Sequence, residues 1–219
     1  MIFINFKTYP TGTGQSAVSL VGQLTELARN THVKLIPVVQ AADLREITAT
    51  TTLEVWAQHI DPISYGAHTG SILPEAVIED GAQGTFLNHS ERKFESFADL
   101  KIAHARALEV GLKTLIFAQD LSEFKLVLEL KPTYVSYEPP ELIGRSDKSV
   151  ASEEPDIIKK ACRLAKAMST PLIVGAGIHS REDIKTSLEL GASGFAIASD
   201  IMKAEDPIKE LKELIEGYN

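Results

Sequence analysis

The sequence has only one cysteine, Cys162, among its 219 residues. One thiol can form neither an internal disulfide nor a cysteine metal cluster. The apolar spacing around Cys162 instead predicts a buried position on a helix, which is the commoner role of a free cysteine. The chain also lacks His-x-x-x-His and comparable metal-ligand spacings, so we expect no metal site.

Long apolar runs and an excess of positive charge are missing too. No stretch approaches the apolar run of about 20 residues that a membrane helix requires. The first residues, Met1-Ile2-Phe3-Ile4-Asn5, lack the basic and apolar regions of a secretory signal. A formal net charge of −8 disfavours general nucleic-acid binding and favours solubility. We therefore expect a cytoplasmic protein without nucleic-acid or membrane partners.

Short apolar runs alternate with longer helical patterns along the whole chain. The runs are continuously apolar, which is typical of parallel strands buried on both faces. Strands are predicted at residues 2–7, 33–39, 54–58, 84–87, 113–117, 133–137, 171–174 and 194–198. Helices are predicted at residues 15–29, 41–50, 74–80, 97–109, 121–130, 154–168, 180–190 and 207–217. Asp120, Ser180 and Asp206 stand where helix N-caps are wanted.

Eight strand–helix units predict the α/β class, with a parallel sheet and right-handed crossovers. Equal units without a linker favour a closed (β/α)8 barrel, one domain over residues 1–219, rather than an open doubly wound sheet. The chain is shorter than the roughly 250 residues typical of this barrel, so some helices should be shortened. No Gly-x-Gly-x-x-Gly follows the first strand, which weakens a dinucleotide-binding interpretation.

Polar residues follow the predicted strands, at the edge where barrels place their chemistry. Glu138 precedes Pro139 and Pro140, which end the sixth strand because proline cannot donate to a sheet ladder. His89 follows the fourth strand, where the start of a short helix would favour a neutral imidazole. Taken alone, these are equally compatible with a surface glutamate before a turn and a surface histidine in a capping turn. The remaining five histidines are interpreted as structural or surface residues.

The first strand ends in Asn5-Phe6-Lys7, and strand alternation would put Asn5 and Lys7 on one face. Lys7 alone is also compatible with a solvated cation at a strand end. Small residues follow the last two strands, as Gly175-Ala176-Gly177 and Ala198-Ser199, and allow backbone N–H groups to approach phosphate. A cation, an imidazole, a carboxylate and a phosphate nest on one rim predict proton abstraction next to a carbonyl of a small phosphorylated substrate.

Several segments resemble the triosephosphate isomerase family in order and spacing. They are Asn5-Phe6-Lys7, residues 87–92 (Leu-Asn-His-Ser-Glu-Arg), residues 137–144 (Tyr-Glu-Pro-Pro-Glu-Leu-Ile-Gly) and Gly175-Ala176-Gly177. The short chain resembles the compact archaeal-type branch of that family. The resemblance implies interconversion of dihydroxyacetone phosphate and D-glyceraldehyde 3-phosphate in glycolysis and gluconeogenesis, without cofactor or metal.

The resemblance also implies roles for individual residues. Glu138 would be the base, His89 the neutral electrophile, Lys7 the cation near the enediolate, with Asn5 polarising the oxygen and Glu91 supporting Lys7. The lid would comprise Pro139, Pro140, Glu141, Leu142, Ile143 and Gly144. The phosphate would contact Asn5, Lys7, Ile143, Gly144, Gly175, Ala176, Gly177, Ala198 and Ser199.

This chain departs from the family pattern in three loops. The usual small hinge after Gly144 reads Arg145-Ser146-Asp147-Lys148, Gly177 replaces a serine, and Ala198-Ser199 replaces two glycines. Thr69 resembles a residue that reaches a neighbouring subunit, which implies a homo-oligomer, either a dimer or, as in the compact branch, a homotetramer. The alternatives are another phosphate-binding barrel enzyme of aldolase or lyase type, and a catalytically inactive phosphosugar-binding protein.

Overall fold

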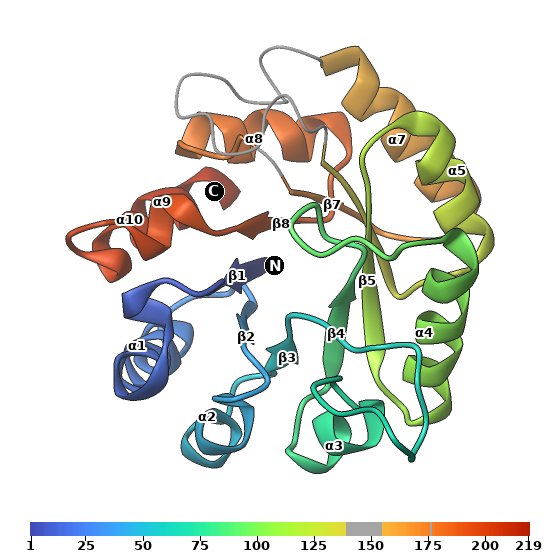
Figure 1. Ribbon diagram of the computed structural model, residues 1–219. Coiled ribbons are helices and arrows are strands. Elements are labelled where there is room, and N and C mark those ends of the chain that lie inside the picture. The colour runs from blue at the N-terminus through green and yellow to red at the C-terminus, as the bar shows by residue number, and fades with distance from the viewer. Residues whose placement is uncertain (139–154, 176) are drawn as a thin grey trace.

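The computed structural model describes residues 1–138, 155–175 and 177–219. Its strands close into a parallel barrel in chain order, and β8 pairs with β1. Figure 1 shows these strands at the centre of the molecule with helices around them. The strands are β1 (Ile2–Asn5), β2 (Leu35–Val39), β3 (Trp56–Ala57), β4 (Gly84–Leu87), β5 (Lys113–Ala118), β6 (Tyr134–Tyr137), β7 (Leu172–Val174) and β8 (Gly194–Ile197).

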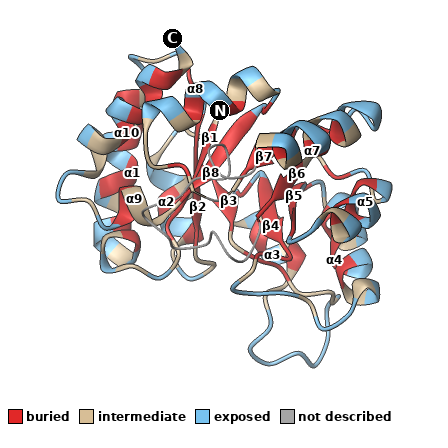
Figure 2. Ribbon diagram, turned by 90° about the horizontal axis from the view of Figure 1, so that it is seen from above, coloured by how far each residue is buried: buried red, intermediate tan, exposed pale blue. Residues whose placement is uncertain are grey.

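The helices cover the outside of the barrel and turn exposed faces outward (Figure 2). They are α1 (Gly14–Ala28), α2 (Leu44–Thr50), α3 (Pro74–Glu79), α4 (Phe97–Glu109), α5 (Leu121–Glu129), α7 (Pro155–Ala167), α8 (Arg181–Leu190), α9 (Ser199–Met202) and α10 (Pro207–Ile215), with short 3-10 turns at Pro10–Gly12 and Glu216–Tyr218. Within the described ranges, no helix combines the length and apolar character needed to cross a membrane.

The predicted (β/α)8 barrel is confirmed, and so are three predicted helix starts. The side chains of Asp120, Ser180 and Asp206 each accept backbone N–H groups at the N-termini of α5, α8 and α10. These bonds satisfy donors that a helix start would otherwise leave unpaired.

Several predicted boundaries and one predicted environment were wrong. The third strand keeps only Trp56 and Ala57, and residues 41–43 form a turn before the shortened α2. The first strand ends at Asn5, two residues earlier than predicted. Cys162 lies on α7 but is half-buried rather than buried.

Aromatic side chains fill the centre of the barrel. Phe3 packs edge-on against Trp56 with ring centroids 4.9 Å apart, and Phe86 packs in the same way against Phe117 at 4.9 Å. These rings belong to an inner cluster, separate from the larger core between strands and helices. The inner cluster fills the barrel below its carboxyl end, so the polar side chains at that end lie above closely packed apolar side chains.

Gly84 makes room for Trp56 in this inner cluster. A Cβ at Gly84 would lie 2.4 to 2.6 Å from carbons of the indole ring, too close for any side chain. We expect Gly84→Ala to lower the free energy of unfolding by about 1–3 kcal/mol, the usual cost of overpacking. Urea unfolding at constant protein concentration measures this change.

Gly22→Ala is the matched control, because Gly22 is exposed in the middle of α1 with open space around it. It should raise the free energy of unfolding by roughly 0.5–1 kcal/mol, the difference in helix propensity. Equal effects of the two substitutions would contradict the tight contact between Gly84 and Trp56.

Candidate active site

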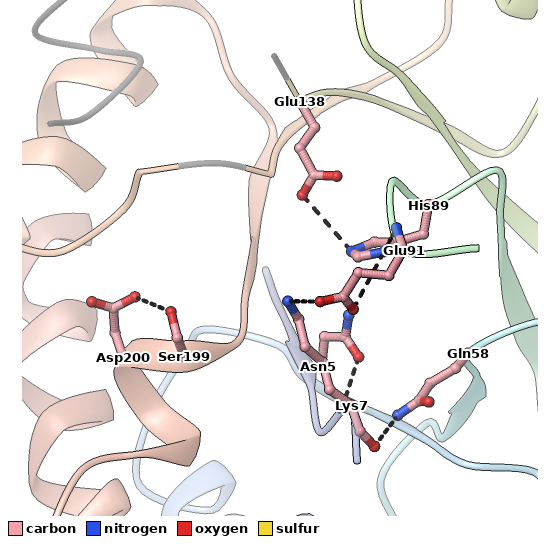
Figure 3. Close-up of polar contacts among 8 residues, drawn as sticks. All are labelled: Asn5, Lys7, Gln58, His89, Glu91, Glu138, Ser199 and Asp200. Atoms are coloured by element: carbon pink, nitrogen blue, oxygen red, sulfur yellow. Dashed lines mark hydrogen bonds and ion pairs between the residues drawn. The ribbon is translucent and has the colours of Figure 1, made fainter. Parts of the chain in front are cut away.

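Lys7 reaches the rim of the barrel by a different route from the one predicted. Strand alternation does not place it, because β1 ends at Asn5 and Lys7 adopts a left-handed backbone with φ of 46°. The Lys7 N–H donates to Asn5 Oδ1 at 3.1 Å, and Gln58 Nε2 donates to the Lys7 carbonyl at 2.9 Å (Figure 3). These bonds hold a conformation that costs roughly 1–2 kcal/mol for a residue with a Cβ.

The Lys7 ammonium forms an ion pair with Glu91. Nζ lies 2.8 Å from Glu91 Oε1, and the Lys7 side chain is only 19% exposed while that of Glu91 is 56% exposed. Because the carboxylate is largely in water, the pair contributes little to stability. Its effect is to keep the ammonium at the rim, near Asn5 and His89, as Figure 3 shows.

His89 lies in a turn after β4, not at the start of the predicted helix. The preceding Asn88 is left-handed, with φ of 59°, and its side chain donates to Phe117 O at 3.0 Å and Glu123 Oε1 at 2.9 Å. Within the turn, the Glu91 N–H donates to His89 Nδ1 at 3.2 Å. That bond requires a lone pair on Nδ1, so the neutral ring carries its proton on Nε2.

Burial makes the neutral imidazole the stable form. Desolvation lowers the pKa of His89 from 6.5 to about 4, and the nearby Lys7 charge adds to the decrease, although Glu91 acts against it. The neutral ring was expected from a helix terminus, but desolvation and the turn produce it here.

Glu138 follows β6 directly and still belongs to its ladder, since its N–H donates to Ala118 O at 2.9 Å. Its side chain is buried, and Oε1 lies 3.8 Å from His89 Nε2. Figure 3 shows the carboxylate and the ring pointing toward each other. A Cβ at Gly175 would lie 2.6 Å from Ser136 Oγ and 3.5 Å from Glu138 Oε1, so the glycine also leaves room beside the carboxylate.

The same burial shifts the Glu138 carboxyl in the opposite direction from His89. Desolvation raises the pKa of Glu138 to about 7, while Ser90 and Lys7 lower it and Glu91 raises it further. Ser90 lies close enough to Glu138 to lower its pKa, although Ser90 Oγ and Glu138 Oε2 are each buried without a hydrogen-bond partner among the described residues. A carboxyl with this pKa exchanges protons near neutral pH, as a general base must.

These side chains line one cavity at the carboxyl ends of the strands, with an empty volume of about 520 Å³ that is partly open to solvent. The predicted residues on its wall are Asn5, Lys7, His89, Glu138, Gly175, Gly177, Ala198 and Ser199. Glu91 reaches the site through the ion pair of its carboxylate with Lys7 and through its backbone N–H, which donates to His89 Nδ1. The predicted lid, 139–144, and Ala176 lie outside the described residues. In the described part of the chain, no group of three His, Cys, Asp or Glu residues is arranged to hold a metal ion.

Sequence reasoning missed three polar residues at this end of the barrel. Gln58 holds the Lys7 carbonyl, and His179 and Asp200 lie on the cavity wall. His179 was interpreted as a structural or surface residue. The available signal was position, because His179 comes two residues after Gly177 and Asp200 directly follows Ser199.

Comparison with known proteins gives a consistent result. The family model described as triosephosphate isomerase matches residues 1–217. The chain is 39% identical over 217 residues to the triosephosphate isomerase of Methanobacterium bryantii, covering 98% of this chain and 95% of that protein. It is 36% identical over 216 residues to that of Sulfurisphaera tokodaii, covering 98% and 93%. It is 36% identical over 217 residues to that of Methanothermus fervidus, covering 98% and 97%.

The state of His89 can be measured by NMR on protein labelled with ¹⁵N-histidine. Because its pKa is lowered to about 4, we expect the His89 ring to remain neutral from pH 8 to about pH 5, with the proton on Nε2. His89→Gln identifies the signal by removing it. Protonation near the ordinary value of 6.5, or a proton on Nδ1 in the neutral ring, would contradict the described geometry.

Proposed function

The chain belongs to the triosephosphate isomerase family, and we infer that it interconverts dihydroxyacetone phosphate and D-glyceraldehyde 3-phosphate, a step of glycolysis. The observation that carries this inference is the facing pair of Glu138 and His89. Glu138 Oε1 lies 3.8 Å from His89 Nε2. The pKa of Glu138 is raised to about 7 and that of His89 is lowered to about 4. At neutral pH the carboxyl can therefore act as a base while the imidazole acts as an uncharged hydrogen-bond donor.

Glu138 is proposed as the base that moves the proton. Its carboxylate takes the proton from the carbon next to the carbonyl, and the C–H electron pair becomes the C=C bond of an enediolate. The carbonyl π electrons move to oxygen, where the neutral Nε2–H of His89 donates a hydrogen bond. The hydroxyl proton of the enediolate then passes to the other oxygen beside His89 Nε2. Glu138 returns its proton to the neighbouring carbon, and the electron pair on the oxygen that lost its proton forms the new carbonyl, which completes the isomerisation. A base with a pKa of about 7 is matched to both proton transfers at neutral pH.

Lys7 and Asn5 are proposed to stabilise the negative charge that develops on the substrate. The Lys7 ammonium is held at the rim by Glu91 and by its constrained backbone, so it need not reorganise during the reaction. Asn5 is buried at the end of β1, where its side chain lies against the same cavity. Glu91 is a positioning residue, since it acts through Lys7 and His89.

The phosphate is proposed to bind backbone N–H groups in the loops after β7 and β8. Gly175, Gly177, Ala198 and Ser199 line the cavity there, which supports this assignment. The additional contacts at Ile143, Gly144 and Ala176, and the lid of residues 139–144, rest on the family resemblance. Closure of that lid would exclude water from the enediolate phosphate.

Assembly and location complete the proposal. We infer one domain over residues 1–219 that forms a homo-oligomer, a dimer or a tetramer, in the cytoplasm. The loop containing Thr69 supports an interface, because residues 64–71 are exposed and Tyr65 is 72% exposed. An exposed aromatic side chain in such a loop suits a contact with another subunit.

The isomerase activity is tested by coupling the conversion of glyceraldehyde 3-phosphate to glycerol-phosphate dehydrogenase and following NADH loss. The pure protein should be active, and Glu138→Ala should lower kcat roughly 10²–10⁴-fold, the contribution of a general base, with little change in KM. Glu129→Ala, on the exposed face of α5, is the matched control and should match the wild type. An inactive wild-type protein would overturn the function, and an unchanged kcat in Glu138→Ala would remove Glu138 as the base.

Lys7→Ala should raise KM and lower kcat together, because the ammonium interacts with both the phosphate and the developing enediolate. Initial rates over a range of substrate concentrations separate the two constants. Lys125→Ala, at an exposed position of α5, serves as the control for loss of one positive charge. If KM is unchanged in Lys7→Ala, Lys7 does not contact the bound substrate.

A further inference from the structure

A histidine–aspartate pair joins the two loops that are proposed to bind phosphate. His179 follows β7 and Asp200 follows β8, and His179 Nδ1 lies 2.7 Å from Asp200 Oδ1. Both residues line the cavity that contains Lys7, His89 and Glu138. Their side chains are 21% and 24% exposed, so the pair is largely shielded from solvent.

The hydrogen bonds around the pair determine what each ring nitrogen can do. Asp200 can only accept when ionised, so His179 Nδ1 carries a proton. The His179 backbone is held separately, since its N–H donates to Asp183 Oδ2 at 3.1 Å. The other ring nitrogen, Nε2, is buried and has no hydrogen-bond partner among the described residues. A buried polar atom of this kind calls for a partner, and a ligand oxygen in the cavity would be one.

The charges around His179 indicate which ligand fits. Carboxylates face it from two elements: Asp183 on α8 and Asp200 on α9. Glu210 on α10 lies near enough to Asp200 for the two charges to interact. A phosphate group beside these carboxylates would be repelled unless a positive group stood between them. A doubly protonated His179 is such a group, because Nδ1–H is bonded to Asp200 and Nε2–H is free to donate to phosphate.

A purely structural role explains less of the geometry. The bond between Nδ1 and Asp200 would pin the two loops together, but it leaves Nε2 buried without a partner. His104 on α4 has a similar ring, since its Nε2 bonds to Leu130 O at 2.9 Å and its Nδ1 is buried without a partner among the described residues. Position distinguishes the two histidines, because His179 lines the cavity and His104 does not. His179 therefore combines a ring held by Asp200, a place on the cavity wall and a ring nitrogen that no described residue satisfies.

We propose that His179, oriented by Asp200, donates Nε2–H to a phosphate oxygen of the bound triose phosphate. This inference rests on the proposed function and adds a side-chain contact to the backbone N–H groups proposed to bind the phosphate in the loops after β7 and β8. Asp200 is a positioning residue that acts through His179.

The test uses the full-length protein with sulfate as the probe, because sulfate resembles phosphate and does not titrate in the working pH range. His179→Gln should raise both the KM for glyceraldehyde 3-phosphate and the inhibition constant of sulfate about 10-fold or more, as expected for a hydrogen bond to a charged group. The kcat should stay within about twofold, since this contact is made equally in the ground and transition states. Asp200→Asn should shift both constants in the same direction by a smaller factor.

A control histidine distinguishes binding from packing. His104→Gln is the matched control and should leave KM and sulfate inhibition unchanged, whatever it does to stability. If a variant does not fold, the ¹⁵N signal of His179 Nε2 in the wild-type protein should still move when sulfate is added.

Two results would overturn the proposal. One is a folded His179→Gln protein with wild-type KM and sulfate inhibition; the other is a His179 Nε2 signal that sulfate leaves in place. If the wild-type protein lacks isomerase activity, the proposed function fails separately. Titration calorimetry with sulfate then decides the inference, because His179→Gln should still bind sulfate about 10-fold more weakly than wild type.

Discussion

Every feature of the site depends on the closure of the barrel between β1 and β8. Ile2 pairs with Phe195 and Ile4 with Ile197, which joins the first strand to the last. Parallel pairing all round makes every strand end at the same rim, so residues far apart in sequence meet there. The Lys7–Glu91 contact spans 84 residues, and no local structure would bring these groups together.

Burial of Glu138 and His89 at this rim shifts their pKa values, and the same burial lowers the free energy of unfolding. For Glu138, the unfolded chain ionises near 4.5 and the folded protein near 7, so stability decreases as pH rises between these values. For His89, the unfolded chain takes up a proton near 6.5 and the folded protein near 4, so stability decreases as pH falls between them. Around neutral pH, the Glu138 penalty is present and the His89 penalty is almost absent. The rest of the barrel must supply the stability that the buried Glu138 carboxyl removes.

The two ends of the proposed substrate site are constructed differently. At the carbon end, side chains are fixed by unusual backbone: Lys7 and Asn88 are both left-handed, and hydrogen bonds to Asn5, Gln58 and Phe117 hold them. At the phosphate end, small residues give access to backbone N–H groups, and the His179–Asp200 pair links the two loops. Rigid placement suits a reaction in which one proton moves a short distance.

The sequence by itself determined the (β/α)8 barrel, because the spacing of apolar residues, the helix N-caps and the glycines that end helices are local properties of the chain. It also located Glu138, since two prolines end a strand at that point whatever surrounds it. Tertiary structure alone decided the direction of Lys7, the turn that sets the His89 tautomer and the partnership of His179 with Asp200, 21 residues away. It also decided both pKa shifts. Desolvation depends on which neighbours exclude water, and those neighbours are assembled only when the barrel closes.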